Sequence, residues 1–190
     1  MLSGYYQWGS TVVARGYFNA GNAASSTGSP DTNIWALRAR LEWDDFADRA
    51  GLRLNPYGEV SYARANMDAY SEAGRAFPAH FDSRTDDATD LRIGVHGAYP
   101  LALGNRTALI GLAEGVHRFQ GEASAVSGKL LGPGGFSFNF DGPSYDQNWF
   151  RAGIGVESTI AGGKAFFMVN GATRGETPSV WVSARYQLAF

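Results

Sequence analysis

Residues 180–190 read Val-Trp-Val-Ser-Ala-Arg-Tyr-Gln-Leu-Ala-Phe, and this stretch decides the fold class. Apolar side chains occupy every second position, and the polar residues Ser183, Arg185 and Gln187 alternate with them. Successive side chains of a β-strand point to opposite faces. The stretch therefore predicts a strand with one apolar face and one mostly polar face.

Similar alternation recurs in seven earlier segments, and no helical pattern of useful length appears. The length of 190 residues suits a single domain. The sequence therefore predicts one all-β, antiparallel domain over residues 1–190. The expected strands are residues 5–20, 32–46, 51–70, 88–101, 107–123, 147–160, 164–175 and 178–190.

The connections between these strands alternate between long loops and short turns. Three long connections, residues 19–31, 71–87 and 124–146, alternate with three short ones, residues 47–50, 102–106 and 161–163. Only the last connection, residues 175–177, breaks this rhythm. Long loops on one side and short turns on the other are typical of outer-membrane barrels.

Two interpretations of the pattern compete, a soluble antiparallel sandwich or barrel and a membrane barrel. Charged residues make up 18% of the chain, whereas a soluble domain usually carries about 25%. The expected strands exceed the usual soluble length of about 5–6 residues, and Lys129 and Lys164 are the two lysines. These features favour an up-and-down transmembrane β-barrel whose apolar face meets lipid and whose polar face lines a lumen.

The polar face of the expected strands supplies the candidate lumen residues. Arginines alternate with glutamates there, and such a set can form ion pairs inside a barrel. In segment 107–123 the pattern is ambiguous, because Glu114 and Arg118 share a face with Leu112 and Val116. The predicted lumen-facing polar residues are Arg15, Arg38, Arg40, Glu42, Arg53, Glu59, Arg92, His96, Arg151, Glu157 and Arg185.

Aromatic residues cluster near the ends of the expected strands, as the interfacial girdles of a membrane barrel do. We expect Tyr6, Trp8, Trp43 and Tyr99 near one end and Trp35, Trp149 and Phe150 near the other.

Three stretches carry a resemblance to a known family. Residues 54–62, Leu-Asn-Pro-Tyr-Gly-Glu-Val-Ser-Tyr, are similar to a strand with a Pro-aromatic start. Residues 132–143, Gly-Pro-Gly-Gly-Phe-Ser-Phe-Asn-Phe-Asp-Gly-Pro, resemble a late outer loop, and residues 182–190 resemble an outer-membrane assembly signal. Together they resemble the autotransporter (type V secretion) β-domain, over most of the chain from about Tyr5 to Phe190.

This resemblance implies a bacterial outer-membrane barrel that translocates an N-terminal passenger and then anchors it. The family's barrel resembles a twelve-stranded pore threaded by a linker helix, whereas eight strands and neither linker helix nor passenger are expected here. The chain is then either the last eight strands of such a barrel or a complete eight-stranded one. Gly94, Gly153 and Gly155 on the inner face would either leave room for a threaded segment or ease close packing.

The resemblance also implies partners. The terminal strand would be read by the barrel-assembly machinery through strand addition, lipid would surround the apolar face, and a passenger segment would occupy the lumen. The mild net charge of −2 gives no reason to expect a nucleic-acid partner. The expected assembly-signal residues are Phe190, Leu188, Tyr186, Ala184 and Val182.

Catalytic and metal-binding motifs are weak. The chain lacks a Gly-x-Ser-x-Gly elbow, and we interpret His96 as a polar lumen residue. The acidic residues Asp82, Asp86 and Asp87 lack the glycine-centred spacing of a calcium loop. We therefore expect no cofactor and no enzyme activity. The alternatives are a small structural or adhesion barrel and, less favoured, an outer-membrane hydrolase.

Overall fold

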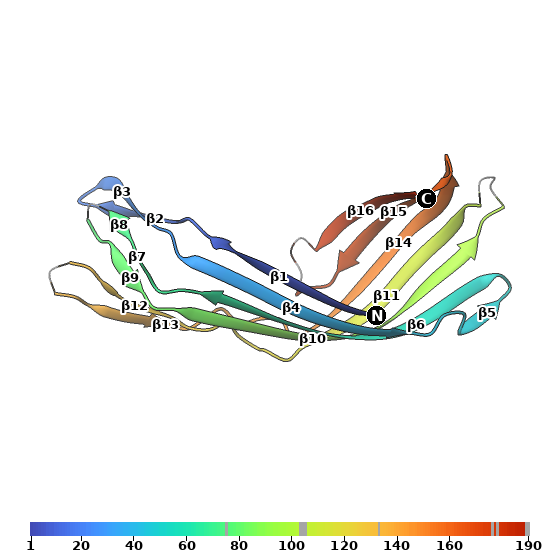
Figure 1. Cartoon of the computed structure of the whole chain (residues 1–190), viewed down its shortest axis with the longest axis horizontal. Helices are drawn as coiled ribbons and strands as arrows, with labels where there is room; N and C mark the ends of the chain where they lie inside the picture. The colour runs from blue at the N-terminus through green and yellow to red at the C-terminus, as the bar shows by residue number, and fades with distance from the viewer. Residues whose placement is uncertain (75, 103–105, 133, 176, 178, 189–190) are drawn as a thin grey trace.

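The computed structural model describes residues 1–74, 76–102, 106–132, 134–175, 177 and 179–188. Its main sheet is antiparallel throughout and curls into a half-barrel (Figure 1). The predicted all-β, up-and-down fold class is therefore confirmed. Eight strands follow one another in the sheet: β1 (Leu2–Ser10), β4 (Asp31–Glu42), β6 (Leu52–Met67), β10 (Arg84–Pro100), β11 (Ala108–Arg118), β14 (Asn148–Ile160), β15 (Gly163–Ala172) and β16 (Val180–Leu188).

The first expected strand, residues 5–20, is two strands. β1 ends at Ser10, and Thr11 donates a backbone hydrogen bond to Pro30 at 2.9 Å. The chain then enters β2 (Val13–Asn19), which belongs to a different sheet. Because proline has no N–H to extend a ladder, Pro30 marks the point where the main sheet stops and the outer extensions begin.

The three long connections form small sheets of their own. β2 pairs with β3 (Asn22–Gly28), which pairs with β8 (Ala73–Gly74). A second outer sheet has the order β13 (Ser137–Phe140), β12 (Val126–Leu130), β9 (Ala79–Phe81) and β7 (Tyr70–Ser71). Figure 1 shows both extensions beyond the same end of the main sheet.

The opposite end of the sheet carries tight turns. Ala161 and Gly162 join β14 to β15, and Ala50 and Gly51 join β5 (Ala47–Arg49) to β6. All four residues have positive φ, between 49° and 82°. Two positive-φ residues between paired strands are the pattern of a type I′ hairpin, whose twist matches that of the strands.

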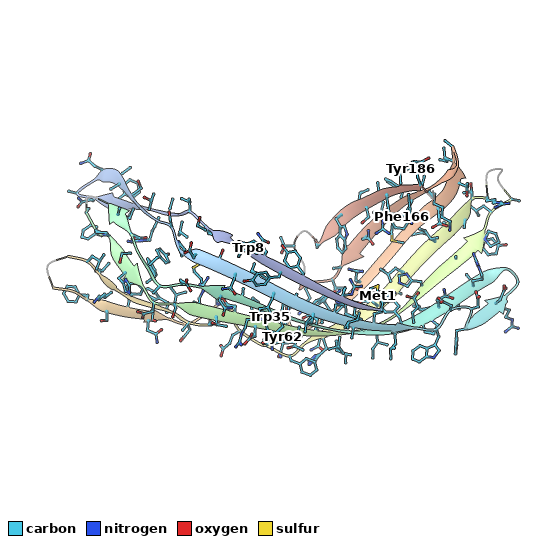
Figure 2. The ribbon with its side chains drawn as sticks, in the orientation of Figure 1. Met1, Trp8, Trp35, Tyr62, Phe166 and Tyr186 are labelled. Atoms are coloured by element: carbon cyan, nitrogen blue, oxygen red, sulfur yellow. The ribbon has the colours of Figure 1, made fainter. Side chains whose placement is uncertain are left out.

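The two faces of the curled sheet differ in chemistry. Val60, Ile93, Ile154 and Val182 lie on the convex face and are exposed. Figure 2 shows Trp35 and Tyr62 together at the lower, convex edge of the sheet, where their ring centroids are 5.1 Å apart. A face of exposed, mostly apolar side chains is what lipid contact requires of a barrel exterior.

The edges of the sheet remain unpaired with each other. Within the described residues β1 pairs with β4 alone and β16 with β15 alone, and Figure 1 shows β1 and β16 apart. The trough between them is therefore open along its length. Among these residues no helix has the length and apolar character needed to cross a bilayer.

Candidate functional site

A band of charged side chains lines the concave face of the half-barrel. The strand register aligns Arg40 with Glu59 and Glu59 with Arg92, and aligns Glu114 with Arg151 on the next strands. Opposite charges directly across an antiparallel pair attract. The predicted lumen residues on this face are Arg38, Arg40, Glu42, Arg53, Glu59, Arg92, His96, Arg151, Glu157 and Arg185.

Glu59 on β6 is the first centre of this band, and it is only 6% exposed. Its Oε2 lies 2.5 Å from Arg38 Nη2 and 3.6 Å from Arg40 Nη1. On the other side its Oε1 lies 3.9 Å from Arg92 Nε. Glu59 therefore joins arginines from the strands on both of its sides.

Glu114 on β11 is the second centre and is 3% exposed. Its Oε1 lies 3.0 Å from Arg92 Nη1 and 2.8 Å from Arg151 Nε. Its Oε2 accepts a hydrogen bond from the Tyr57 hydroxyl. The ambiguous alternation of segment 107–123 left Glu114 out of the predicted set, although its two-residue spacing from Leu112 and Val116 placed it on their face.

Asp90 extends the band toward the outer end of the sheet. Arg118 Nε donates to Asp90 Oδ1 at 2.8 Å, and Arg118 Nη2 donates to Oδ2 at 3.1 Å. Arg92 Nη2 reaches the same Oδ2 at 3.3 Å. The sequence had assigned neither Asp90 nor Arg118 to the lumen, because Asp90 read as part of an acidic loop.

His96 completes the band beside Tyr57. Arg40 Nη2 lies 2.6 Å from His96 Nε2, which must accept because a guanidinium nitrogen has no acceptor lone pair. The two rings of His96 and Tyr57 stack at 4.8 Å, and the Arg40 guanidinium lies 3.7 Å from the centroid of the Tyr57 ring. His96 is thereby held as a structural member of the lining.

The result is one connected ion-pair network across β4, β6, β10, β11 and β14. A carboxylate that is almost completely buried is tolerated when several charged donors satisfy it. Glu59 and Glu114 share Arg92, so neither pair can be removed without affecting the other. The network makes the concave face polar and fixes the curvature of the central strands.

Arg15 is placed elsewhere. It lies on β2 in the outer sheet and binds Glu72 through Nε–Oε1 at 3.1 Å and Nη2–Oε2 at 2.6 Å. The hydrogen bonds to Glu72 raise the pKa of the Arg15 guanidinium above its ordinary value. Burial raises the pKa of the nearby Tyr70 phenol. Arg15 therefore holds the outer extensions together instead of lining the trough.

The predicted girdle residues divide differently from expectation. Tyr6 aligns with Trp35 because β1 ends at Ser10, so Tyr6 and Trp8 lie near Trp35 and away from Trp43. Trp149 lies on the concave face and is buried. The predicted aromatics exposed on or beside the convex face are Tyr6, Trp8, Trp43, Tyr99 and Phe150, and Trp35 is half-buried there.

The predicted assembly signal lies on the edge strand β16. Val182, Ala184, Tyr186 and Leu188 share the convex face, and Phe190 lies outside the described residues. The Tyr186 hydroxyl donates to the carbonyl oxygen of Ile160 at 3.0 Å. This contact fixes the end of β16 against the tight turn between β14 and β15.

The three concave glycines make room for the protein's own side chains. A Cβ on Gly94 would lie 2.7 Å from the Tyr57 ring, and one on Gly153 would lie 2.6 Å from the Asn170 side chain. A Cβ on Gly155 would lie 2.1 Å from the Phe167 carbonyl oxygen. These glycines therefore allow close packing within the sheet.

Comparison with known proteins places the chain in a family. The model of the autotransporter beta-domain family matches residues 2–171. The chain is 25% identical over 167 residues to Esterase EstA of Pseudomonas aeruginosa, covering 81% of this chain and 25% of that protein, and Esterase EstA of Pseudomonas putida matches equally. An uncharacterized protein of the trpE-trpG intergenic region of Pseudomonas putida is 32% identical over 78 residues, which is 40% of this chain and 13% of that protein.

The chain thus spans about a quarter of the length of the EstA proteins. The family match covers most of the described half-barrel, including seven of its eight consecutive strands, β1 through β15. The match and the all-β fold agree on an outer-membrane translocator domain. The chain belongs to the autotransporter beta-domain family.

Proposed function

We propose that this chain forms the lumen wall of an outer-membrane translocator barrel, which supports secretion of a passenger and then anchors it. The observation that carries this proposal is the contrast between the two faces. The convex face is largely apolar and exposed, whereas the concave face carries a network of buried carboxylates and arginines. Such a barrel needs an exterior for lipid and a polar interior for a polypeptide.

The mechanism uses strand pairing and lipid burial without catalysis. Unpaired strand edges are costly in a bilayer, because no water satisfies their backbone groups. The open edges of β1 and β16 therefore support closure of the barrel by further strands, and a complete eight-stranded barrel stays the competing arrangement. An upstream coding region encoding four more alternating strands and a helix would support closure by additional strands.

The partners follow from the same surfaces. Lipid of the bacterial outer membrane covers the convex face, and a passenger segment passes along the concave face. The edge strand β16 is proposed to be read by the barrel-assembly machinery, because its free edge can add to another sheet edge.

A passenger-export assay tests this function. The gene, with an epitope-tagged passenger upstream, is expressed in a Gram-negative host, and surface exposure is measured by protease treatment of intact cells. We expect the tag at the surface when the barrel is assembled. An assembled barrel with the tag retained in the periplasm would contradict the proposal.

Hydrolysis is the second candidate, and one observation favours it. Ser71 Oγ lies 3.0 Å from His80 Nδ1, and His80 Nε2 lies 3.9 Å from Asp82 Oδ1, all in or beside the outer sheet. A serine beside a histidine is the minimum arrangement for a nucleophile and its base. Release of p-nitrophenol from a short-chain ester that is lost in Ser71→Ala would establish this activity, whereas we expect no activity in either protein.

A further inference from the structure

The concave face contains an apolar patch within its charged lining. Tyr57, Leu112 and Met168 are buried together there, with Ile110 and Phe166 packed against them. A barrel lumen that served only as a wet channel would have no need of this patch. Apolar groups gathered on an otherwise polar face mark a binding site.

The patch forms part of a recess of about 300 Å³. Ile110, Phe166 and Met168 supply its apolar lining, and Ala98 lies beside Ile110 in the register. Gly155 lies between Ile110 and Met168 in the same register row, so a small residue stands between two large ones. The row is therefore hollow at its middle, with space for a leucine-sized or phenylalanine-sized group.

Two arginines flank the recess. Arg53 lines it, and Arg185 lies opposite Phe166 on β16. Both are exposed, and neither makes an ion pair with another described residue. The acidic side chains in the lining are Asp45 and Glu157, and Glu157 lies 3.4 Å from Lys164 Nζ.

We propose that this recess binds a segment of the secreted polypeptide by taking one large apolar side chain, while a carboxylate of that segment pairs with Arg53 or Arg185. The inference rests on the proposed function, which places a polypeptide along the concave face. A guanidinium binds a carboxylate with two parallel hydrogen bonds, so a flanking glutamate or aspartate complements the site better than a lysine. The recess thus selects which part of a passing chain can rest in the lumen.

Peptide binding to the full chain in detergent micelles tests the inference. The probe is a fluorescein-labelled, alanine-rich and serine-rich helical peptide with one leucine and one glutamate a helical turn apart. Fluorescence anisotropy should show this peptide binding about tenfold more tightly, equivalent to about 1.4 kcal/mol, than peptides with serine for leucine or lysine for glutamate. Equal binding of all three peptides would overturn the inference.

Variants of the chain separate the recess from the rest of the surface. Ala98→Leu fills the recess and should weaken binding of the leucine peptide about tenfold. Ala39→Leu, on the exposed convex face, is the matched control and should leave binding unchanged. Arg185→Glu should shift the preference toward the lysine peptide, and an unchanged preference would refute the charge pairing.

Two outcomes distinguish this inference from the function on which it rests. Failure of the peptide to bind, with normal surface display of the passenger, would overturn the inference and leave the translocator function standing. Failure of passenger display by an assembled barrel would count against the function itself. Uptake of the fatty acid laurate by the recess without peptide binding would show that a small amphiphile is the occupant and would also overturn the inference.

Discussion

The hydroxyl of Tyr57 on β6 donates a hydrogen bond to Glu114 on β11, across the intervening strand β10. The contact is possible because β10 has Gly94 at the crossing point, directly opposite both residues in the register. It ties together two strands that do not pair with each other. The centre of the curled sheet is therefore held by side chains as well as by its ladder.

Gly94→Val should destabilise the folded sheet. A Cβ at this position would lie 2.7 Å from both the Tyr57 ring and the Glu114 Cβ. Overpacking of this kind typically costs about 1–3 kcal/mol, measured as a lower midpoint of urea unfolding in micelles. Gly58→Val is the control, because a Cβ on Gly58 has no heavy atom within 4 Å. Equal loss in both variants would contradict the crossing contact.

Glu114→Leu should be more disruptive than loss of an exposed ion pair. The substitution leaves Arg92 and Arg151 beside a missing carboxylate, and an uncompensated buried charge typically costs about 3–5 kcal/mol. Glu157→Gln breaks only the exposed contact with Lys164, worth about 0–1 kcal/mol. Heat-modifiable gel migration should shift to lower temperature in the first variant and stay near wild type in the second.

Ile154→Arg and Ser183→Arg place the same charge on opposite faces of neighbouring strands. Ile154 is exposed on the convex face, whereas Ser183 aligns with Met168 on the concave face. An arginine facing lipid costs about 2–4 kcal/mol near the bilayer centre. Refolding yield into lipid vesicles should fall for Ile154→Arg and remain near wild type for Ser183→Arg; the reverse order would exchange the assigned faces.

Deletion of Phe190 should impair membrane assembly, since the terminal apolar residue belongs to the proposed assembly signal. The measurement is the fraction of protein that resists extraction from outer membranes and shows heat-modifiable migration. Gln187→Ala, on the opposite face of β16, is the matched control and should assemble normally. Normal insertion without Phe190 would refute its role as a signal.

Glu72→Gln should loosen the outer extensions without affecting the main sheet. The Glu72 side chain is almost fully buried, pairs with Arg15 and accepts a hydrogen bond from the Ala79 backbone at 3.0 Å. Limited proteolysis should cut the long loops faster in this variant, while heat-modifiable migration stays unchanged. Glu122→Gln, an exposed loop position, controls for loss of charge alone.

The sequence by itself determined the elements and their chemistry. Two-residue alternation predicted the strands β4 to β16 of the main sheet closely, because the side chains of a strand alternate strictly between faces. The same alternation placed Arg38, Arg40, Glu59 and Arg92 on one face of their strands. A single strand carries that information, so no knowledge of its neighbours was needed.

Only the tertiary structure decided how the strands meet. The break after Ser10 depends on pairing with residues far along the chain, so the alternation of residues 5–20 predicted one strand and placed Tyr6 at the wrong end. The roles of Glu114 and Asp90 depend on which arginines lie across the register, and those partners are 22–37 residues away for Glu114. Register is set by long-range pairing, and it converts a set of alternating charges into a network and a recess.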